Sequence, residues 1–363
     1  MGVSVEILSV VGARPQFVKA APVSMALEVA GLKEFLVHTG QHYDHKMSEV
    51  FFTELNMAPP SLNLQVGSGS HADQTAAMLI GLERAIQDEK PDMVMVYGDT
   101  NSTLAGALAA AKLNVPVAHV EAGLRSYNRS MPEEINRIVA DSISDLLLVP
   151  TETARRNLIG EGVSESQIVI TGDVMFDAAL KFKQLASEKS TILRNLRLID
   201  VPFVLTTIHR AENTDDPARM RAIIEGLRQV AEEIRVIFPM HPRTKGRCAD
   251  YGISDFGAVE VTEPVGFLDM IWMEANASVV ATDSGGVQKE AFFHSVPCVT
   301  IREETEWSEL VDSGWNRLVS PDTGETISTA ILDARGTSGQ AIEPYGRGDA
   351  SVRIAEALRD WGN

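Results

Sequence analysis

Short runs rich in β-branched residues alternate with longer helical segments along this chain, and this alternation limits the possible folds more than any other feature. The expected strands of the first half are Ser4–Val11, Phe35–Thr39, Met93–Tyr97, Val117–Val120, Leu146–Val149 and Ile168–Thr171. Intervening segments such as Asp73–Glu89 and Thr103–Leu113 have a helical pattern. Strands separated in this way predict βαβ units with right-handed crossovers and a parallel sheet. The chain is therefore expected to be α/β.

A charged segment, Asp177–Asp200, interrupts the alternation. A second set of strands is then expected at Phe203–Thr207, Val236–Pro239, Val259–Val261, Ser278–Thr282 and Cys298–Ile301. We therefore predict two Rossmann-like domains facing each other across a cleft. The expected parts are an N-terminal domain at 1–175, a hinge connector at 176–200, a C-terminal domain at 201–345, and a helix in 346–363 that packs back on the N-terminal domain.

Composition narrows the class of protein. A chain of 363 residues is long enough for two cores. Its net charge of -18 argues against nucleic acid or an anionic membrane as a partner. The two cysteines, Cys248 and Cys298, provide neither a disulfide framework nor metal-ligand spacing. The start of the chain lacks the basic region of a secretory signal, so a cytoplasmic enzyme is expected.

Acidic residues follow two neighbouring strands of the first half. Asp99 and Glu121 each come directly after a buried strand, and Glu133 opens the next expected helix. Ligands of open parallel sheets bind outside the carboxyl ends of the strands, so these carboxylates suggest acid–base chemistry. Asp99 could instead be an ordinary helix N-cap. Glu121 caps no evident helix, and Arg125 is a candidate ion-pair partner for it. Arg137, one turn after Glu133, is expected on the same helix face.

Two cations follow the first strand. Gly12 permits a tight turn there, and Pro15 suits the first turn of a helix. Arg14 and Lys19 could then approach a phosphate or a developing oxyanion at the helix N-terminus. The alternative is an ordinary helix start with two solvated cations.

Gln41 and His42 lie in a polar loop after the second strand. A metal site built from His42, Asp44 and His45 lacks a third partner at convincing spacing, so metal binding is not expected. Hydrogen bonding around the cleft is the preferred interpretation.

The second half carries residues suited to anion binding. His209 and His241 follow strands, where a general acid or a phosphate ligand would lie, although each could be a structural histidine. Ser284–Gly286 begin a helix whose free N–H groups can bind a diphosphate. Glu290, one turn along, could accept both hydroxyls of a ribose. The GxxxxGK[ST] phosphate loop of nucleotide triphosphatases does not occur.

The chain closely resembles the non-hydrolysing UDP-N-acetylglucosamine 2-epimerases, essentially from end to end. The resemblance rests on GARPQFVKAAPV, TGQHYD, YGDTNSTLAGAL, HVEAGLRS, MPEEINR, PTETARRNL, TGDVMFDA, HRAENTD, HPRT, DSGGVQKEA and PYGRGDAS. It implies a glycosyltransferase-B type fold, a cytoplasmic homodimer and no cofactor. It also implies inversion at C2 of the sugar: UDP is eliminated to leave a 2-acetamidoglucal, and UDP then adds back. UDP-GlcNAc and UDP-ManNAc would interconvert as precursors of glycans or cell-surface polysaccharides.

The resemblance implies roles for individual residues. The catalytic candidates are Asp99, Glu121 and Glu133 as acid–base groups, with Arg14, Lys19 and His209 stabilising the substrate and the leaving group. The implied substrate-binding residues are Gln41, His42, Arg137, His241, Met270, Ser284, Gly285, Gly286, Glu290, Arg302 and Trp307.

Some motifs depart from the commoner family pattern. Trp307 replaces a substrate-contacting arginine, Met270 stands where a uracil-facing phenylalanine is frequent, and Val265 replaces a glutamine. This variant set is similar to enzymes acting on UDP-2,3-diacetamido-2,3-dideoxyglucuronate, which is the alternative substrate. The extra carboxylate of this uronate sugar would favour additional cations in the binding site, for which Arg125 and Arg129 are available. A retaining glycosyltransferase of the same fold is disfavoured by the acid–base carboxylates.

Overall fold

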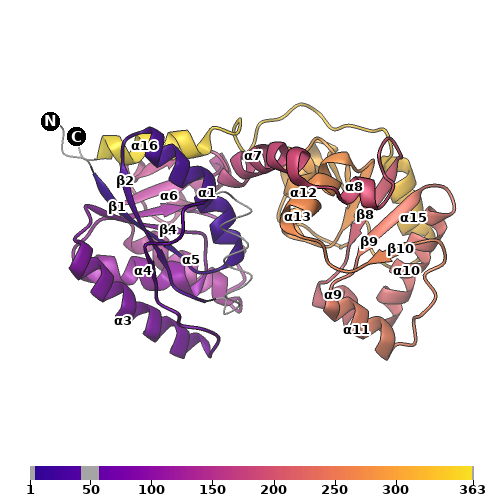
Figure 1. Cartoon of the computed structure of the whole chain (residues 1–363), viewed down its shortest axis with the longest axis horizontal. Helices are drawn as coiled ribbons and strands as arrows, with labels where there is room; N and C mark the ends of the chain where they lie inside the picture. The colour runs from indigo at the N-terminus through magenta and orange to yellow at the C-terminus, as the bar shows by residue number, and fades with distance from the viewer. Residues whose placement is uncertain (1–4, 42–56, 362–363) are drawn as a thin grey trace. The chain divides into compact units, whose positions relative to one another are not determined.

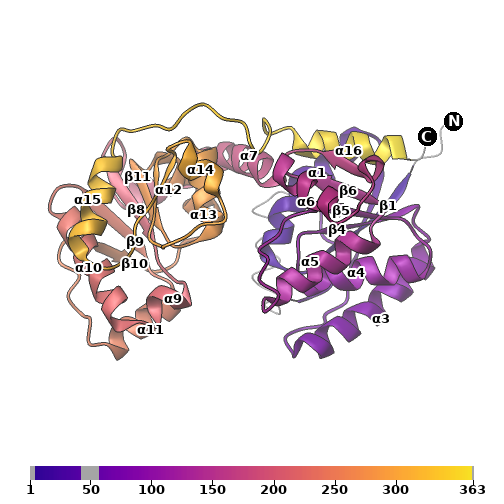
Figure 2. The ribbon, with the colours of Figure 1, turned by 180° about the vertical axis from the view of Figure 1, so that it is seen from behind.

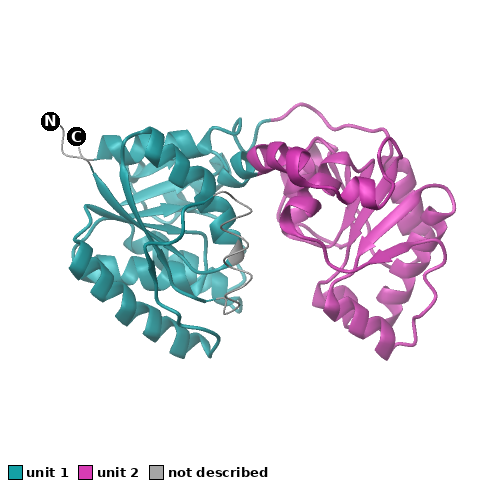
Figure 3. Ribbon diagram, viewed as in Figure 1, with its two compact units in different colours: residues 1–178, 343–363 teal, residues 179–342 magenta. Residues whose placement is uncertain are grey.

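The computed structural model describes residues 5–41 and 57–361. It consists of two compact units, each with its own parallel sheet (Figure 3). Unit 1 comprises residues 1–178 and 343–363, and unit 2 comprises residues 179–342. The α/β class with two Rossmann-like units, predicted from the alternation of strands and helices, is confirmed.

Unit 1 is built on a sheet whose described strands run in the order β3-β2-β1-β4-β5-β6-β7. These strands are β1 (Glu6–Val11), β2 (Lys33–His38), β3 (Leu62–Asn63), β4 (Met93–Tyr97), β5 (Val117–Val120), β6 (Leu146–Val149) and β7 (Ile168–Ile170). Val10 pairs with Val37 on one side and Val96 on the other, so β1 is central. After β1, the chain places β2 and β3 on one side of β1 and then β4 to β7 on the other side. The strand order therefore reverses between β1 and β4. Such a reversal is where open α/β sheets bind ligands. The short strand β3 was not predicted, because two residues show no periodicity.

Helices cover both faces of this sheet. They are α1 (Arg14–Val29), α3 (His71–Glu89), α4 (Asn101–Lys112), α5 (Pro132–Ile143), α6 (Glu152–Gly160) and α16 (Ala350–Trp361). Figures 1 and 2 show α3, α4 and α5 on one face, with α1 and α16 together on the other. A Cβ atom at Gly106 of α4 would lie 2.9 Å from Val96 Cγ1, so only glycine allows α4 to pack this closely on β4. This packing fixes the start of α4 beside the end of β4.

Unit 2 has the strand order β10-β9-β8-β11-β12-β13, with the reversal between β8 and β11. Its strands are β8 (Phe203–Thr207), β9 (Arg235–Pro239), β10 (Glu260–Thr262), β11 (Val279–Thr282), β12 (Cys298–Thr300) and β13 (Asn316–Leu318). Its helices are α8 (Ile192–Asn195), α9 (Ala211–Thr214), α10 (Pro217–Ala231), α11 (Pro242–Asp250), α12 (Phe267–Asn276), α13 (Gly285–Phe293), α14 (Ser308–Asp312) and α15 (Gly324–Ala334). Strand β13 was not predicted. Among the helices described in both units, none has the length and apolar character of a membrane span.

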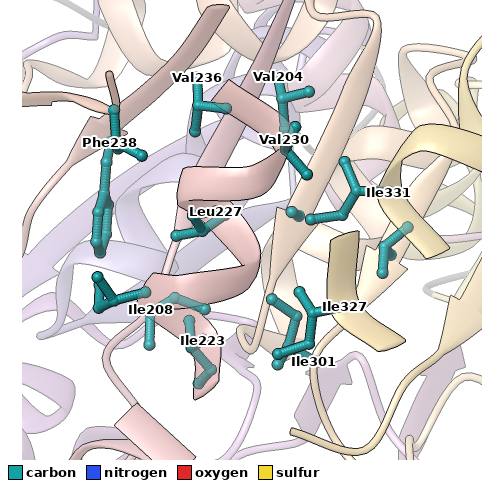
Figure 4. Packing of buried hydrophobic residues seen from close by; sticks show 14 of the residues in the cluster. Val204, Ile208, Ile223, Leu227, Val230, Val236, Phe238, Ile301, Ile327 and Ile331 are labelled. Atoms are coloured by element: carbon teal, nitrogen blue, oxygen red, sulfur yellow. The ribbon is translucent and has the colours of Figure 1, made fainter. Parts of the chain in front are cut away.

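The core of unit 2 shows how amphipathic helices close over the sheet. Figure 4 shows Leu227 of α10 and Ile327 of α15 packed beneath Val204, Val236 and their neighbours. Leu227 has no exposed surface. Its replacement by alanine is expected to cost about 2–5 kcal/mol of the free energy of unfolding.

Helix α7 (Val174–Lys189) contains the boundary between the two units. The chain returns to unit 1 at Glu343, and α16 packs against α1. The buried carboxylate of Asp177 accepts hydrogen bonds from the backbone N–H groups of Ala350 and Ser351 at 3.1 and 2.7 Å. A carboxylate at a helix N-terminus is favourable, so this contact ties α16 to unit 1.

Candidate active site

Asp99 and Glu121 follow the carboxyl ends of β4 and β5, and Lys19 of α1 lies beside them. Glu121 forms an ion pair with Lys19, and both side chains are largely buried, at 10% and 13% exposure. A Cβ atom on Gly98 would lie 3.3 Å from Glu121 Oε2 and 3.4 Å from Lys19 Nζ, so the turn before Asp99 lies against this ion pair. The backbone of Glu121 has φ +71°, a conformation that is uncommon for residues other than glycine. Such backbone strain tends to occur at active sites.

Lys19 is surrounded by carboxylates. Burial lowers the pKa of Lys19, but Glu121, Asp99 and Asp173 together outweigh burial, so the pKa of Lys19 is raised. Lys19 therefore carries its charge throughout the physiological range. Asp173, which is buried after β7, was not singled out from the sequence because a single aspartate in a loop has no distinguishing pattern.

Asp99 is held through both its side chain and its backbone. Its carboxylate pairs with Arg137, and its carbonyl oxygen accepts a hydrogen bond from Asn136 Nδ2 at 2.9 Å. Arg137 also contacts Glu134 at 3.0 Å. Glu133 is exposed, and the contact that Arg137 makes on this helix is with Glu134, three residues before it.

The buried Glu134 has a structural role. It accepts hydrogen bonds from the backbone N–H groups of Ser126 and Tyr127 at 3.0 and 2.9 Å. Burial raises its pKa, but these bonds and Arg137 outweigh burial and lower it. The participation of Glu133 in catalysis stays a prediction.

The predicted pairing of Arg125 with Glu121 is wrong. Arg125 instead contacts Asp141 and Glu161, each at 2.6 Å, and its side chain is 1% exposed. Spacing along a loop does not specify the loop's conformation, and Glu161 is distant in the sequence. Arg125 is therefore not available to bind an additional carboxylate on a sugar.

The turn between β1 and α1 is fixed by Gln16, which was not predicted. Gln16 Oε1 accepts the backbone N–H of Gly12 at 2.8 Å, and its Nε2 donates to the carbonyl of Tyr97 at 2.7 Å. A side chain at Gly12 would overlap Ser102. The predicted site residue Gln41 accepts a hydrogen bond from Ser102 Oγ at 2.8 Å, which places it at the same edge. The side chain of Arg14 and the whole of His42 lie outside the described residues.

In unit 2, a buried aspartate organises the sheet edge. Asp283 accepts hydrogen bonds from the backbone N–H groups of His209 and Arg210 at 3.1 and 3.0 Å. Asn213 Nδ2 donates to the same carboxylate at 3.1 Å. Asp283 therefore joins the turn after β8 to the turn after β11. Asp283 was not predicted as a site residue, because the functional signal in the sequence at this turn is the Ser-Gly-Gly segment that follows it.

The two predicted histidines lie together, with ring centroids 5.9 Å apart. Burial lowers the pKa of His209, and His241 and Arg210 lower it further. Asp283 raises this pKa, but by less, so the net shift is downward. His209 is therefore neutral at pH 7. His241 caps α11, since its Nδ1 accepts the backbone N–H of Arg243 at 3.2 Å. Its role in substrate binding stays a prediction.

Gly285 and Gly286 form the start of α13, where cationic and aromatic groups converge. A Cβ atom at Gly285 would lie 3.4 Å from Arg210 Nη2. Trp307 Nε1 donates to the carbonyl oxygen of Gly285 at 2.9 Å, and Lys289 Nζ lies 4.3 Å from the Trp307 ring centroid. The indole N–H of Trp307 thus supports the turn.

Further predicted residues lie on nearby elements of unit 2. Arg302 is buried and contacts Glu212 at 2.9 Å and Glu306 at 3.0 Å. Glu290 and Met270 are half-buried on α13 and α12. These positions are compatible with the predicted binding roles, which stay predictions. Within the described residues, no group of three histidine, cysteine or acidic side chains is arranged to hold a metal ion.

Comparisons with known proteins identify the family. The model described as UDP-N-acetylglucosamine 2-epimerase matches residues 26–359. The chain is 49% identical over 361 residues to UDP-2,3-diacetamido-2,3-dideoxy-D-glucuronate 2-epimerase of Pseudomonas aeruginosa, covering 97% of this chain and 99% of that protein. It is 48% identical over 360 residues to a UDP-N-acetylglucosamine 2-epimerase homolog of Methanococcus maripaludis, covering 98% and 99%.

Solved structures agree with these relatives. The UDP-GlcNAc 2-epimerase of Methanocaldococcus jannaschii in complex with UDP-GlcNAc and UDP has a TM-score of 0.82 and 42% identity, with 99% of this chain and 100% of that chain covered. The resemblance found in the sequence motifs is confirmed. This chain belongs to the UDP-N-acetylglucosamine 2-epimerase family, a family of isomerases.

Proposed function

We propose that this protein is a non-hydrolysing 2-epimerase that interconverts UDP-GlcNAc and UDP-ManNAc. The observation that carries the proposal is the pair of carboxylates Asp99 and Glu121 at neighbouring strand ends, each in contact with a cation. Relatives that bind or are named for UDP-GlcNAc support the choice of substrate.

The proposed reaction eliminates UDP from C1 and C2 and adds it back after C2 is reprotonated on the opposite face. A weakly acidic C2 hydrogen needs a positioned base, and reprotonation from the other face needs an acid. Asp99 and Glu121 supply these two groups in the proposal, with Glu133 as a third candidate. Lys19 keeps its positive charge beside Glu121. The assignment of each carboxylate to one face of C2 is left open.

The departing UDP carries negative charge that must be stabilised. The start of α13 offers backbone N–H groups, and Arg210 lies beside it. Helix N-termini and arginines are the groups proteins use for diphosphates. Elimination followed by re-addition leaves the oxidation state unchanged, so these side chains and backbone groups suffice without a cofactor. The proposed enzyme is a cytoplasmic homodimer.

UDP-2,3-diacetamido-2,3-dideoxyglucuronate is the second candidate substrate, favoured by the identity to the Pseudomonas aeruginosa enzyme. Its sugar carboxylate would need a cation that is not already paired. Arg125 is excluded by its contacts with Asp141 and Glu161, which leaves the exposed Arg129 in that loop.

A parallel assay tests the function. Purified protein is incubated separately with UDP-GlcNAc and with the diacetamido-uronate substrate, and epimer formation is followed by proton NMR. We expect the C2 epimer of UDP-GlcNAc and no free ManNAc. If only the uronate were epimerised, the second candidate would be the substrate. Absence of epimerisation in both, or UDP release that depends on an added acceptor, would contradict the proposal.

A further inference from the structure

His119 of β5 is a fully buried histidine with a hydrogen-bond acceptor at each ring nitrogen. Its Nε2 lies 2.7 Å from the carbonyl oxygen of Gly98, and its Nδ1 lies 2.7 Å from Asp141 Oδ1. A carbonyl oxygen can only accept. Asp141 also accepts hydrogen bonds from Arg125 Nη1 at 2.6 Å and from the backbone N–H of Gly123 at 3.1 Å, so this carboxylate also acts only as an acceptor. Both contacts are hydrogen bonds only when both ring nitrogens of His119 carry a proton.

His119 and Asp141 together connect the two turns that present Asp99 and Glu121. Gly98 directly precedes Asp99, so the Nε2 contact holds the turn after β4. The second oxygen of Asp141 accepts the backbone N–H of Gly123 at 3.1 Å, two residues after Glu121. Asp141 therefore holds the turn after β5 while His119 holds the turn after β4.

The turn after β5 has a backbone conformation that needs support, because Glu121 has φ +71°. Gly98, in the turn after β4, has φ +62°, which glycine adopts without strain. A left-handed conformation at a residue other than glycine costs about 1–3 kcal/mol and persists only where surrounding contacts enforce it. The bond from Gly123 to Asp141 is such a contact, and Arg125 fixes Asp141 from the other side at 2.6 Å.

We propose that His119 and Asp141 are positioning residues, which hold Asp99 and Glu121 in reactive geometry through an imidazole that donates a hydrogen bond from each ring nitrogen. The inference rests on the proposed function of those two carboxylates. Separating His119 from Asp141 would leave a buried polar group without its partner, which is costly in free energy. The two side chains are therefore held close together. A fixed geometry of this kind matters because small misplacements of catalytic groups reduce rates strongly.

His294 provides a matched control. It is also buried, at the end of α13, but neither of its ring nitrogens has a hydrogen-bond partner among the described residues. Burial, with a smaller contribution from Lys183, lowers the pKa of His294 to about 4. The chain thus contains one buried histidine expected to be charged and another expected to be neutral.

The charge state can be measured in the wild-type protein. Long-range proton–nitrogen NMR of ¹⁵N-histidine-labelled protein at about pH 7.5, where a solvated histidine is mostly neutral, reports how many ring nitrogens carry protons. We expect two for His119 and one for His294, with signals assigned through His119→Asn and His294→Asn. A single protonated nitrogen on His119 would overturn the proposal, and this result does not depend on enzyme activity.

Kinetics test the positioning role. His119→Asn can keep a donor facing Asp141 and loses the one facing Gly98. We expect kcat to fall on the order of 10²-fold while KM changes less than about threefold, because geometry is lost and binding is retained. His294→Asn should leave kcat within about threefold of the wild type. A folded His119→Asn enzyme with wild-type kcat would overturn the proposal, whereas an inactive wild type would contradict the proposed function instead.

Discussion

At the carboxyl ends of their strands, the two units present opposite kinds of side chain. Unit 1 presents the carboxylates Asp99 and Glu121, and each is paired with a cation of its own unit. Unit 2 presents Arg210 and the bare helix start at Gly285 and Gly286. The strand order reverses at the middle of both sheets, so in the proposed function the same topology serves proton transfer in one unit and anion binding in the other.

Buried ionisable groups differ in the same way. In unit 1, Asp141 is compensated by His119 and Arg125. In unit 2, neither carboxyl oxygen of Glu274 has a hydrogen-bond partner among the described residues. Paired charges rigidify a site, whereas an unpaired group avoids the cost of burial by becoming neutral. In the proposed function, the paired charges of unit 1 are held in place for chemistry, and Arg210 of unit 2 lies at the sheet edge for a ligand.

The largest expected effect is on unit 1. Asp99→Asn and Glu121→Gln each preserve size while removing a group that must exchange a proton. We expect kcat to fall by about 10²–10⁴-fold with UDP affinity unchanged, measured by initial rates and calorimetry. If either folded variant kept wild-type kcat, that carboxylate would have no acid–base role and the division between units would fail.

A pH-dependent effect is expected in unit 2. Burial and the neighbouring carboxylate of Glu290 raise the pKa of Glu274 well above its ordinary value. The folded state then keeps a proton that the unfolded chain loses above about pH 4.3. The free energy of unfolding therefore falls with rising pH in that window, by about 1.4 kcal/mol per pH unit, until the folded-state pKa is reached.

Glu274→Gln should lack this decline, because an amide has no proton to lose. Denaturant unfolding between about pH 5 and about pH 8 measures the difference, which should grow in favour of the variant as pH rises. Glu325→Gln, at an exposed position of the same unit, controls for the change in net charge. Parallel stability profiles for wild type and Glu274→Gln would show that Glu274 is ionised and compensated.

The helix start of α13 is tested by adding one methyl group. A Cβ atom on Gly286 meets nothing closer than Ser284 Oγ at 4.0 Å, so Gly286→Ala should be tolerated by the fold. The methyl group would occupy the approach to the backbone N–H groups, and we expect UDP to bind about tenfold more weakly by calorimetry. Gly246→Ala, in α11 with open space around it, is the matched control. Equal UDP affinity in both variants would show that the diphosphate does not bind at this helix start.

The smallest expected effect concerns Trp307. Trp307→Phe removes the hydrogen bond to the Gly285 carbonyl but keeps an aromatic ring near Lys289. Loss of one such bond should weaken UDP binding about threefold. Trp315→Phe loses an equivalent indole bond to the carbonyl of Gln340 and should leave UDP affinity unchanged. A larger loss for Trp307→Phe than for Gly286→Ala would indicate direct contact between the indole and the ligand.

Much of this arrangement could be predicted from the sequence. Apolar runs located the long strands, and the polar residues directly after them, including Asp99, Glu121 and His209, were correctly expected at strand ends. The pairing of side chains could not be predicted, because it depends on contacts distant in the sequence. Lys19 and Glu121 are 102 residues apart, and they meet only because β1 and β5 lie on either side of β4.

Residues that support the site were harder to find than those that form it. Gln16 and Asp141 lie within helices, where a single polar residue on a buried face has no distinctive pattern. Asp141 becomes recognisable only when its contacts with His119, Gly123 and Arg125 are seen together. The wrong expectation for Arg125 has the same origin, since its partner Glu161 belongs to a different loop.

The central claim is that the carboxylates of unit 1 remove and replace the hydrogen at C2 of the sugar. The most direct test follows UDP-GlcNAc in deuterium oxide by proton NMR during turnover. We predict that the epimerised product carries deuterium at C2 from its first appearance. An epimer that retains the original C2 hydrogen would contradict the proposed elimination and the role assigned to Asp99 and Glu121.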